Sequence, residues 1–151
     1  MSSRRKLSAE LQQQVRTRAN FLCEFCHASE QWQYVQFTID HLLPIAQGGT
    51  NDPNNLALSC FHCNRRKTDQ TNCLDPQTEQ VVLLFNPRRD QWSEHFIWSP
   101  DGLRILGLTA TGRATIAALD LNRLRVINIR AADLQIGRHP PSDDPIQPFT
   151  L

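Results

Sequence analysis

Two identically spaced cysteine pairs constrain the fold of this chain more than any other feature. Cys23 and Cys26 form the first pair, and Cys60 and Cys63 form the second, each with two residues between the thiols. Thiolates at this spacing can bind one ion from a tight turn, and two such turns close a tetrahedral shell with Zn–S distances of about 2.3 Å. Four thiolates leave no coordination position open. The sequence therefore predicts a structural Zn²⁺ site rather than a catalytic one.

The cysteines also allow other interpretations. They could form two unrelated thiol pairs, or one pair could be redox-active. His27 and His62 lie beside or within the pairs, and either could replace a cysteine as a ligand. The fifth cysteine, Cys73, has no partner at metal spacing, and we expect it to take no part in the site.

The composition favours a folded intracellular protein. Hydrophobic residues make up 40% of the chain and charged residues 21%, which excludes a disordered polar chain. We see no long apolar run and no apolar segment after the basic first residues, so we expect no membrane association and a cytoplasmic location. In a reducing compartment, cysteines more often bind metal than form disulfides.

The first half of the chain predicts a small α+β core. Ser8 is a plausible N-cap for a helix that extends to about Asn20, with an apolar residue every fourth position. Residues 34–40 alternate and are rich in β-formers, which predicts a strand. After a loop rich in Gly, Asn and Pro, residues 56–59 predict a second strand.

The rest of the chain predicts an extension. A helix is expected from Asn64 onward, then a polar linker at residues 68–80 and a strand at residues 81–85. The turn Ser99-Pro100-Asp101-Gly102 predicts a β-hairpin, and residues 113–136 predict one or two helices. We thus expect three parts, at residues 8–70 (the core), 81–136 (an α+β extension) and 137–151 (a Pro-rich tail).

The segment between the cysteine pairs resembles the HNH endonuclease family, in the subset whose ββα-metal core is bracketed by two CxxC knuckles. Four stretches carry the resemblance, namely Phe37-Thr38-Ile39-Asp40-His41-Leu42-Leu43-Pro44, Gly48-Gly49-Thr50-Asn51-Asp52, Asn54-Asn55-Leu56-Ala57-Leu58 and Cys60-Phe61-His62-Cys63-Asn64-Arg65-Arg66-Lys67. The resemblance implies a ββα-metal nuclease core with structural zinc. The N-terminal helix, a C-terminal β-hairpin and helices complete the expected α+β fold.

The resemblance also implies roles for individual residues. His41 would be the general base, and Asp40 and Asn64 would hold a catalytic divalent ion. The middle asparagine of the pattern, here Asn55 with Asn54 as the alternative, would tether the loop that orients the base. These roles suit phosphodiester hydrolysis, in which a neutral imidazole takes a proton from water and hard oxygen ligands hold Mg²⁺ or Mn²⁺.

Basic residues suggest the partner. Arg65, Arg66 and Lys67 follow the motif and could contact phosphates, although such a run is often only a solvated helix face. The N-terminal segment carries further basic residues, namely Arg4, Arg5, Lys6, Arg16 and Arg18. We expect DNA as the substrate, with RNA as the alternative. The net charge of only +1 neither supports nor excludes this.

Two other function classes fit the pattern. The chain could be a non-catalytic zinc-binding module that recognises nucleic acid or protein, or a zinc-ribbon subunit of a larger machine. Individually, Asp40 and His41 could be exposed polar residues, and Asn64 could be a helix cap. A pure binding module has no need for all three, so the sequence favours a metal-dependent endonuclease.

Overall fold

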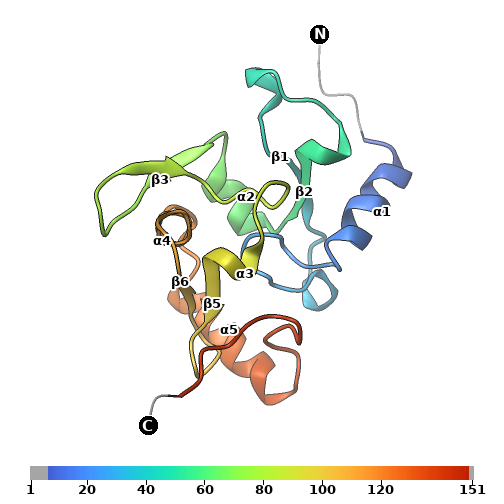
Figure 1. Ribbon diagram of the computed structural model, residues 1–151. Helices are drawn as coiled ribbons and strands as arrows, with labels where there is room; N and C mark the ends of the chain where they lie inside the picture. The colour runs from blue at the N-terminus through green and yellow to red at the C-terminus, as the bar shows by residue number, and fades with distance from the viewer. Residues whose placement is uncertain (1–6, 150–151) are drawn as a thin grey trace. The chain divides into compact units, whose positions relative to one another are not determined.

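The computed structural model describes residues 7–149, which divide into two units (Figure 1). The first unit contains the described residues up to Thr71 together with Asn86–Arg89. The second contains Asn72–Phe85 and the described residues from Asp90 onward. Arg4, Arg5 and Lys6, which contribute to the expected basic N-terminal segment, lie outside the described residues.

The first unit begins with helix α1 (Ala9–Arg18). Ser8 is its N-cap, because the Ser8 hydroxyl accepts a hydrogen bond from the Leu11 N–H at 3.1 Å. Val15 is fully buried and anchors the apolar side of the helix. The helix predicted from Ser8 is therefore confirmed, and its last residue lies two positions before Asn20.

The ββα core follows. Strand β1 (Thr38–His41) pairs antiparallel with β2 (Leu56–Ser59), and helix α2 (Phe61–Lys67) comes directly after β2. Every residue of β2 is buried. Short 3₁₀ turns at Glu30–Trp32, Ile45–Gln47 and Pro53–Asn55 interrupt the connecting segments.

Strand β1 is shorter than the sequence predicted. Its partner β2 has only four residues before Cys60 turns the chain into α2, so residues 34–37 have no strand to pair with. Tyr34 and Val35 are exposed, while Phe37 is buried. Helix α2 also begins at Phe61 rather than Asn64, because Cys60 caps it.

The second unit carries two β-ribbons and three helices. Its elements are β3 (Asn72–Leu74), β4 (Val81–Leu83), α3 (Trp92–His95), β5 (Phe96–Trp98), β6 (Ile105–Gly107), α4 (Ala110–Leu119) and α5 (Leu124–Gln135). The predicted hairpin corresponds to β5 and β6, and the predicted helices correspond to α4 and α5. Strand β3 lies in the segment that we expected to be a linker, and it pairs with β4.

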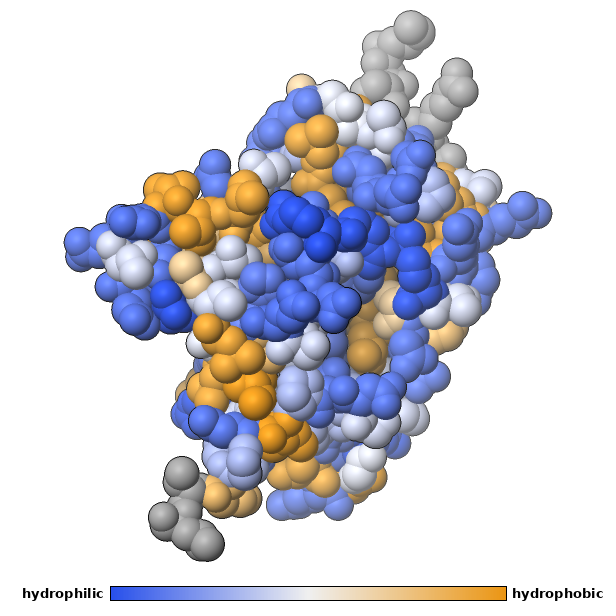
Figure 2. Space-filling model, in the orientation of Figure 1, coloured by the Kyte–Doolittle hydropathy of each residue, from blue (hydrophilic) through white to orange (hydrophobic). Residues whose placement is uncertain are grey.

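Buried aromatic residues form the centre of the second unit. The Trp92 ring packs against both Phe96 and Trp98, with ring centroids 5.1 Å and 5.9 Å away respectively, and all three residues are buried. By contrast, Leu74, Val81 and Leu83 are exposed, and Figure 2 shows apolar side chains gathered over the β3–β4 ribbon. Within residues 7–149, no helix has the length and apolar character needed to cross a membrane.

Candidate functional site: a four-cysteine cluster beside an Asp-His strand end

The four paired cysteines come together in the first unit. Their Sγ atoms all lie within 4.8 Å of one another, and all four residues are buried. The Sγ atoms of Cys26 and Cys60 are 3.8 Å apart. This separation matches the edge of a tetrahedron whose corners lie about 2.3 Å from its centre, the Zn–S distance. The cluster therefore fits a structural zinc ion, as the spacing predicted.

The electrostatics of the cluster also suit a cation. Burial raises the pKa of the Cys23 thiol well above its ordinary value, because no solvent stabilises the thiolate there. Hydrogen bonds from Cys23, Cys60 and Cys63 hold the pKa of Cys26 well below its ordinary value. A dication at the centre would allow the remaining thiols to ionise as well.

Backbone and side-chain contacts join this cluster to the strands. The Glu24 N–H donates to the Leu58 carbonyl at 2.9 Å, and the Leu58 N–H donates to the Glu24 carboxylate at 2.9 Å. On the other side, the Cys63 N–H points to the Cys60 sulfur at 3.4 Å, at the start of α2. A zinc ion here would consequently fix the position of β2 relative to α2.

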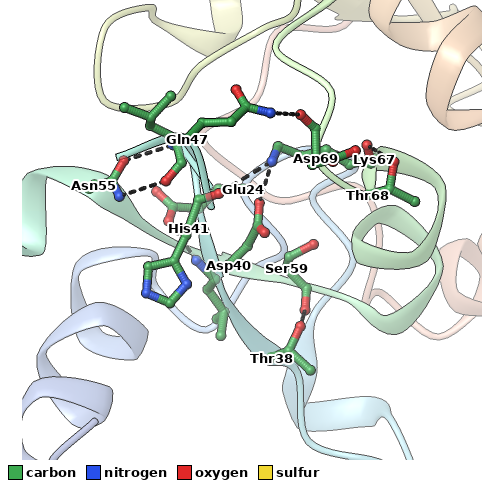
Figure 3. Close-up of polar contacts among 12 residues, drawn as sticks. Glu24, Thr38, Asp40, His41, Gln47, Asn55, Ser59, Lys67, Thr68 and Asp69 are labelled. Atoms are coloured by element: carbon green, nitrogen blue, oxygen red, sulfur yellow. Dashed lines mark hydrogen bonds and ion pairs between the residues drawn. The ribbon is translucent and has the colours of Figure 1, made fainter. Parts of the chain in front are cut away.

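Asp40 lies near the end of β1 and is only 8% exposed. Its Oδ2 atom is 3.0 Å from the Nζ atom of Lys67, the last residue of α2, which is 2% exposed (Figure 3). Burial raises the pKa of the Asp40 carboxyl, and the Lys67 ammonium partly opposes this shift. The pair therefore joins β1 to α2 through buried charges.

His41 is the last residue of β1, and its imidazole is half-buried. Figure 3 shows the ring pointing away from the Asp40–Lys67 ion pair. His41 nevertheless lies close enough to Asp40 to help lower the pKa of that carboxyl. The Nε2 atom of His41 is 2.8 Å from the Oδ1 atom of Asn51, which comes from the loop between the two strands.

Asn55 closes that loop. Its Oδ1 accepts from the Leu43 N–H at 2.8 Å, and its Nδ2 donates to the carbonyls of Leu43 at 3.0 Å and Thr50 at 2.9 Å. Gly49 lies against the same backbone, so that a Cβ atom there would overlap the Leu43 carbonyl. These hydrogen bonds tie the loop after His41 back to the start of β2.

Helix α2 carries the remaining predicted residues. Asn64 is half-buried and lies three residues before Lys67, so both side chains belong to the same side of the helix, the side that reaches Asp40. Arg65 and Arg66 are exposed. Lys67 is not: the three basic residues do not form one exposed run, because the Lys67 ammonium is turned inward to Asp40.

Two arginines of α1 make ion-pair and hydrogen-bond contacts within the first unit. Arg16 pairs with the Glu30 carboxylate at 3.2 Å and donates to the Phe37 carbonyl at 2.8 Å. Arg18 donates to the carbonyls of Pro53 at 2.9 Å and Leu56 at 2.7 Å. These contacts hold α1 against the segments that flank β1 and β2.

The sequence pattern does not identify three of these residues. It places Lys67 among the expected phosphate contacts, indicates no separate role for Asn51 and gives no sign of Glu24, whose carboxylate also pairs with Arg88. The one available signal was position, because Lys67 follows Asn64 at the spacing that places both on one side of a helix. Nothing local marks Asn51 or Glu24.

The Asp40 carboxylate lies beside a buried cation of the protein itself, Lys67. The Lys67 ammonium lies 3.0 Å from Oδ2 as an ion pair, and among residues 7–149 no other side chain or backbone group donates a hydrogen bond to this buried oxygen. Within the described residues, the four cysteines are the only cluster of three or more His, Cys, Asp or Glu side chains suited to a metal. An ion at Asp40 and Asn64 would therefore be held by few protein ligands, with positions left open for substrate and water.

Comparison with known proteins identifies the same part of the chain. The sequence model of the HNH endonuclease family matches residues 23–70. The matched segment contains both cysteine pairs, both strands of the ββα unit and helix α2. No curated protein matches the chain, and no solved structure does.

Proposed function

We propose that this chain, whose residues 23–70 form an HNH domain, is a metal-dependent endonuclease that hydrolyses phosphodiester bonds in DNA. HNH domains act on nucleic acids, so a nuclease-type function is the starting point. The finer assignment adds His41 as the general base, Asp40 and Asn64 as ligands of a catalytic Mg²⁺ or Mn²⁺, and the four cysteines as ligands of a structural Zn²⁺.

One observation supports the assignment most directly. His41 ends β1 beside Asp40, whose carboxylate reaches the side of α2 that carries Asn64. A base and two oxygen ligands thus come from neighbouring elements of one small ββα unit. Asn55 ties the loop between the strands to this unit, so the backbone that directly follows His41 is constrained.

The residues would divide the reaction as follows. The His41 imidazole takes a proton from a water molecule, whose oxygen then forms a bond to phosphorus while the bond to the leaving sugar oxygen breaks. The leaving oxygen takes up a proton from solvent, and His41 later releases the one that it holds. When bound, the divalent ion neutralises the charge that develops on the phosphate.

Substrate binding would depend on exposed cations. Arg65 and Arg66 lie on the exposed side of α2 and would contact the phosphate backbone near the scissile bond. Lys67 would act inside the protein instead, opposite the Asp40 charge. We assign no role to the second unit.

The test is plasmid nicking with added Mg²⁺ or Mn²⁺, with an RNA of matched sequence assayed in parallel. Replacing the base, in His41→Ala, should leave zinc content and DNA binding intact and lower the single-turnover rate by ~10²–10⁴-fold. His139→Ala is the matched control, since this histidine lies in the second unit and is also partly buried. It should cut like wild type.

The same assay separates the alternatives. If excess metal fully restores His41→Ala, then His41 is a ligand rather than the base. If wild type binds DNA but does not cut it under any metal, the chain is a non-catalytic recognition module. Preferential cutting of the RNA would correct the substrate class.

A further inference from the structure

The contact between His41 and Asn51 has a chemical consequence. The Nε2 atom of His41 lies 2.8 Å from the side-chain oxygen of Asn51. An amide oxygen only accepts hydrogen bonds, so Nε2 must carry the proton in this arrangement. A neutral imidazole has one N–H group. Its other nitrogen, Nδ1, therefore keeps a lone pair that can accept a proton.

Asn51 is well placed to impose this arrangement because its neighbours in the chain are tethered. The carbonyl of Thr50 accepts from the Asn55 amide at 2.9 Å, and the Thr50 hydroxyl accepts from the Asp52 N–H at 3.2 Å. The Asp52 carboxylate in turn accepts from the Asn54 N–H at 2.8 Å. Asn51 thus sits in a loop whose backbone is fixed on both sides of it.

We propose that Asn51 is a positioning residue that holds His41 in the Nε2–H tautomer, so that Nδ1 faces the attacking water and takes its proton. The inference rests on the proposed function and deepens it. During the reaction one water O–H bond breaks and an Nδ1–H bond forms, while the Nε2–H bond to Asn51 persists.

The direct test is the tautomer itself, measured by ¹⁵N NMR on histidine-labelled, zinc-loaded protein without DNA or added Mg²⁺. We expect His41 of the wild type to be a single Nε2–H tautomer at a pH where the ring is neutral. In Asn51→Ala, the ring should become a mixture of the two tautomers. Asn54→Ala is the matched control, an exposed neighbour that should leave the His41 signals unchanged.

Kinetics provide the second readout. Asn51→Ala should lower the single-turnover rate by about 10- to 100-fold, as loss of an orienting partner typically does, with little change in the DNA concentration at half-saturation. Asn51→Asp retains an acceptor oxygen and should recover most of the rate. A merely structural asparagine would show neither the rescue nor the tautomer change.

The outcomes distinguish this proposal from the one on which it rests. Suppose that the wild type cuts DNA. If its His41 is then mainly the Nδ1–H tautomer, or if the His41 tautomer is the same in Asn51→Ala as in the wild type, the role of Asn51 is overturned and the nuclease function is retained. A wild type that does not cut overturns both, whatever the tautomer.

Discussion

The ammonium of Lys67 lies 3.0 Å from the carboxylate of Asp40, and both side chains are almost completely removed from solvent. A charged pair in this position joins the end of the first strand to the end of the helix. It also places a cation against the carboxylate that we propose as a metal ligand. Lys67 thereby balances the Asp40 charge within the fold.

Breaking this pair should destabilise the protein strongly. Lys67→Met keeps much of the side-chain volume but leaves the Asp40 carboxylate buried without its cation, which typically costs about 3–5 kcal/mol. Urea unfolding of the zinc-loaded protein, followed by circular dichroism, measures the loss. Exposed Arg65→Met is the control and should change the free energy of unfolding by less than about 0.5 kcal/mol.

The double variant Asp40→Asn/Lys67→Met sharpens this prediction. Removing both charges should cost less than removing Lys67 alone, because no unpaired buried charge remains. If the single Lys67→Met variant is as stable as wild type, the ion pair does not contribute to the free energy of unfolding.

The zinc cluster should dominate the stability of the first unit. Cys60→Ser removes one of the four thiolate ligands but leaves a side chain that can still cap α2, and structural zinc binding is worth on the order of 10 kcal/mol in small domains. We expect less than one zinc per chain by elemental analysis and loss of cooperative unfolding. Cys73→Ser, which changes a cysteine outside the cluster, should keep one zinc per chain and cooperative unfolding. Wild type purified without chelator and lacking zinc would contradict the assignment.

The two metal sites should differ in how readily they lose their ions. Brief exposure to EDTA should abolish DNA cutting while circular dichroism and zinc content stay unchanged, because four buried thiolates release an ion more slowly than Asp40 and Asn64 would. Adding Mg²⁺ should then restore cutting. Simultaneous loss of activity, zinc and secondary structure would show that one metal site serves both purposes.

Exposed arginines on α2 should contribute to DNA binding through counterion release. Replacing Arg65 and Arg66 with alanine should weaken binding at low salt and reduce the slope of log K against log salt by about one for each phosphate that is no longer neutralised. The control replaces Arg104 and Arg125, two exposed arginines of the second unit, and should keep the wild-type slope. If the slope of log K against log salt is the same in both double variants, Arg65 and Arg66 belong to a solvated surface that does not contact DNA.

Much of the candidate site could be predicted from the sequence because its determinants are local. The cysteine spacing specifies two tight turns, and β2 and the start of α1 follow from short patterns that the structure confirms. The motif around Asp40 and His41 identified the family segment, which the match at residues 23–70 confirms. The roles of individual residues stay predictions.

Only the tertiary structure determined the partners of those residues. Lys67 and Asp40 are 27 positions apart, and nothing in a basic run indicates which cation turns inward once α2 packs against β1. The length of β1 likewise depends on how many residues β2 offers before Cys60 ends it. Asn51 meets His41 because Asn55 closes the loop around both. Contacts between residues that are far apart in the sequence depend on how the helices and strands pack, whereas motif spacing and turn residues are local properties of the sequence.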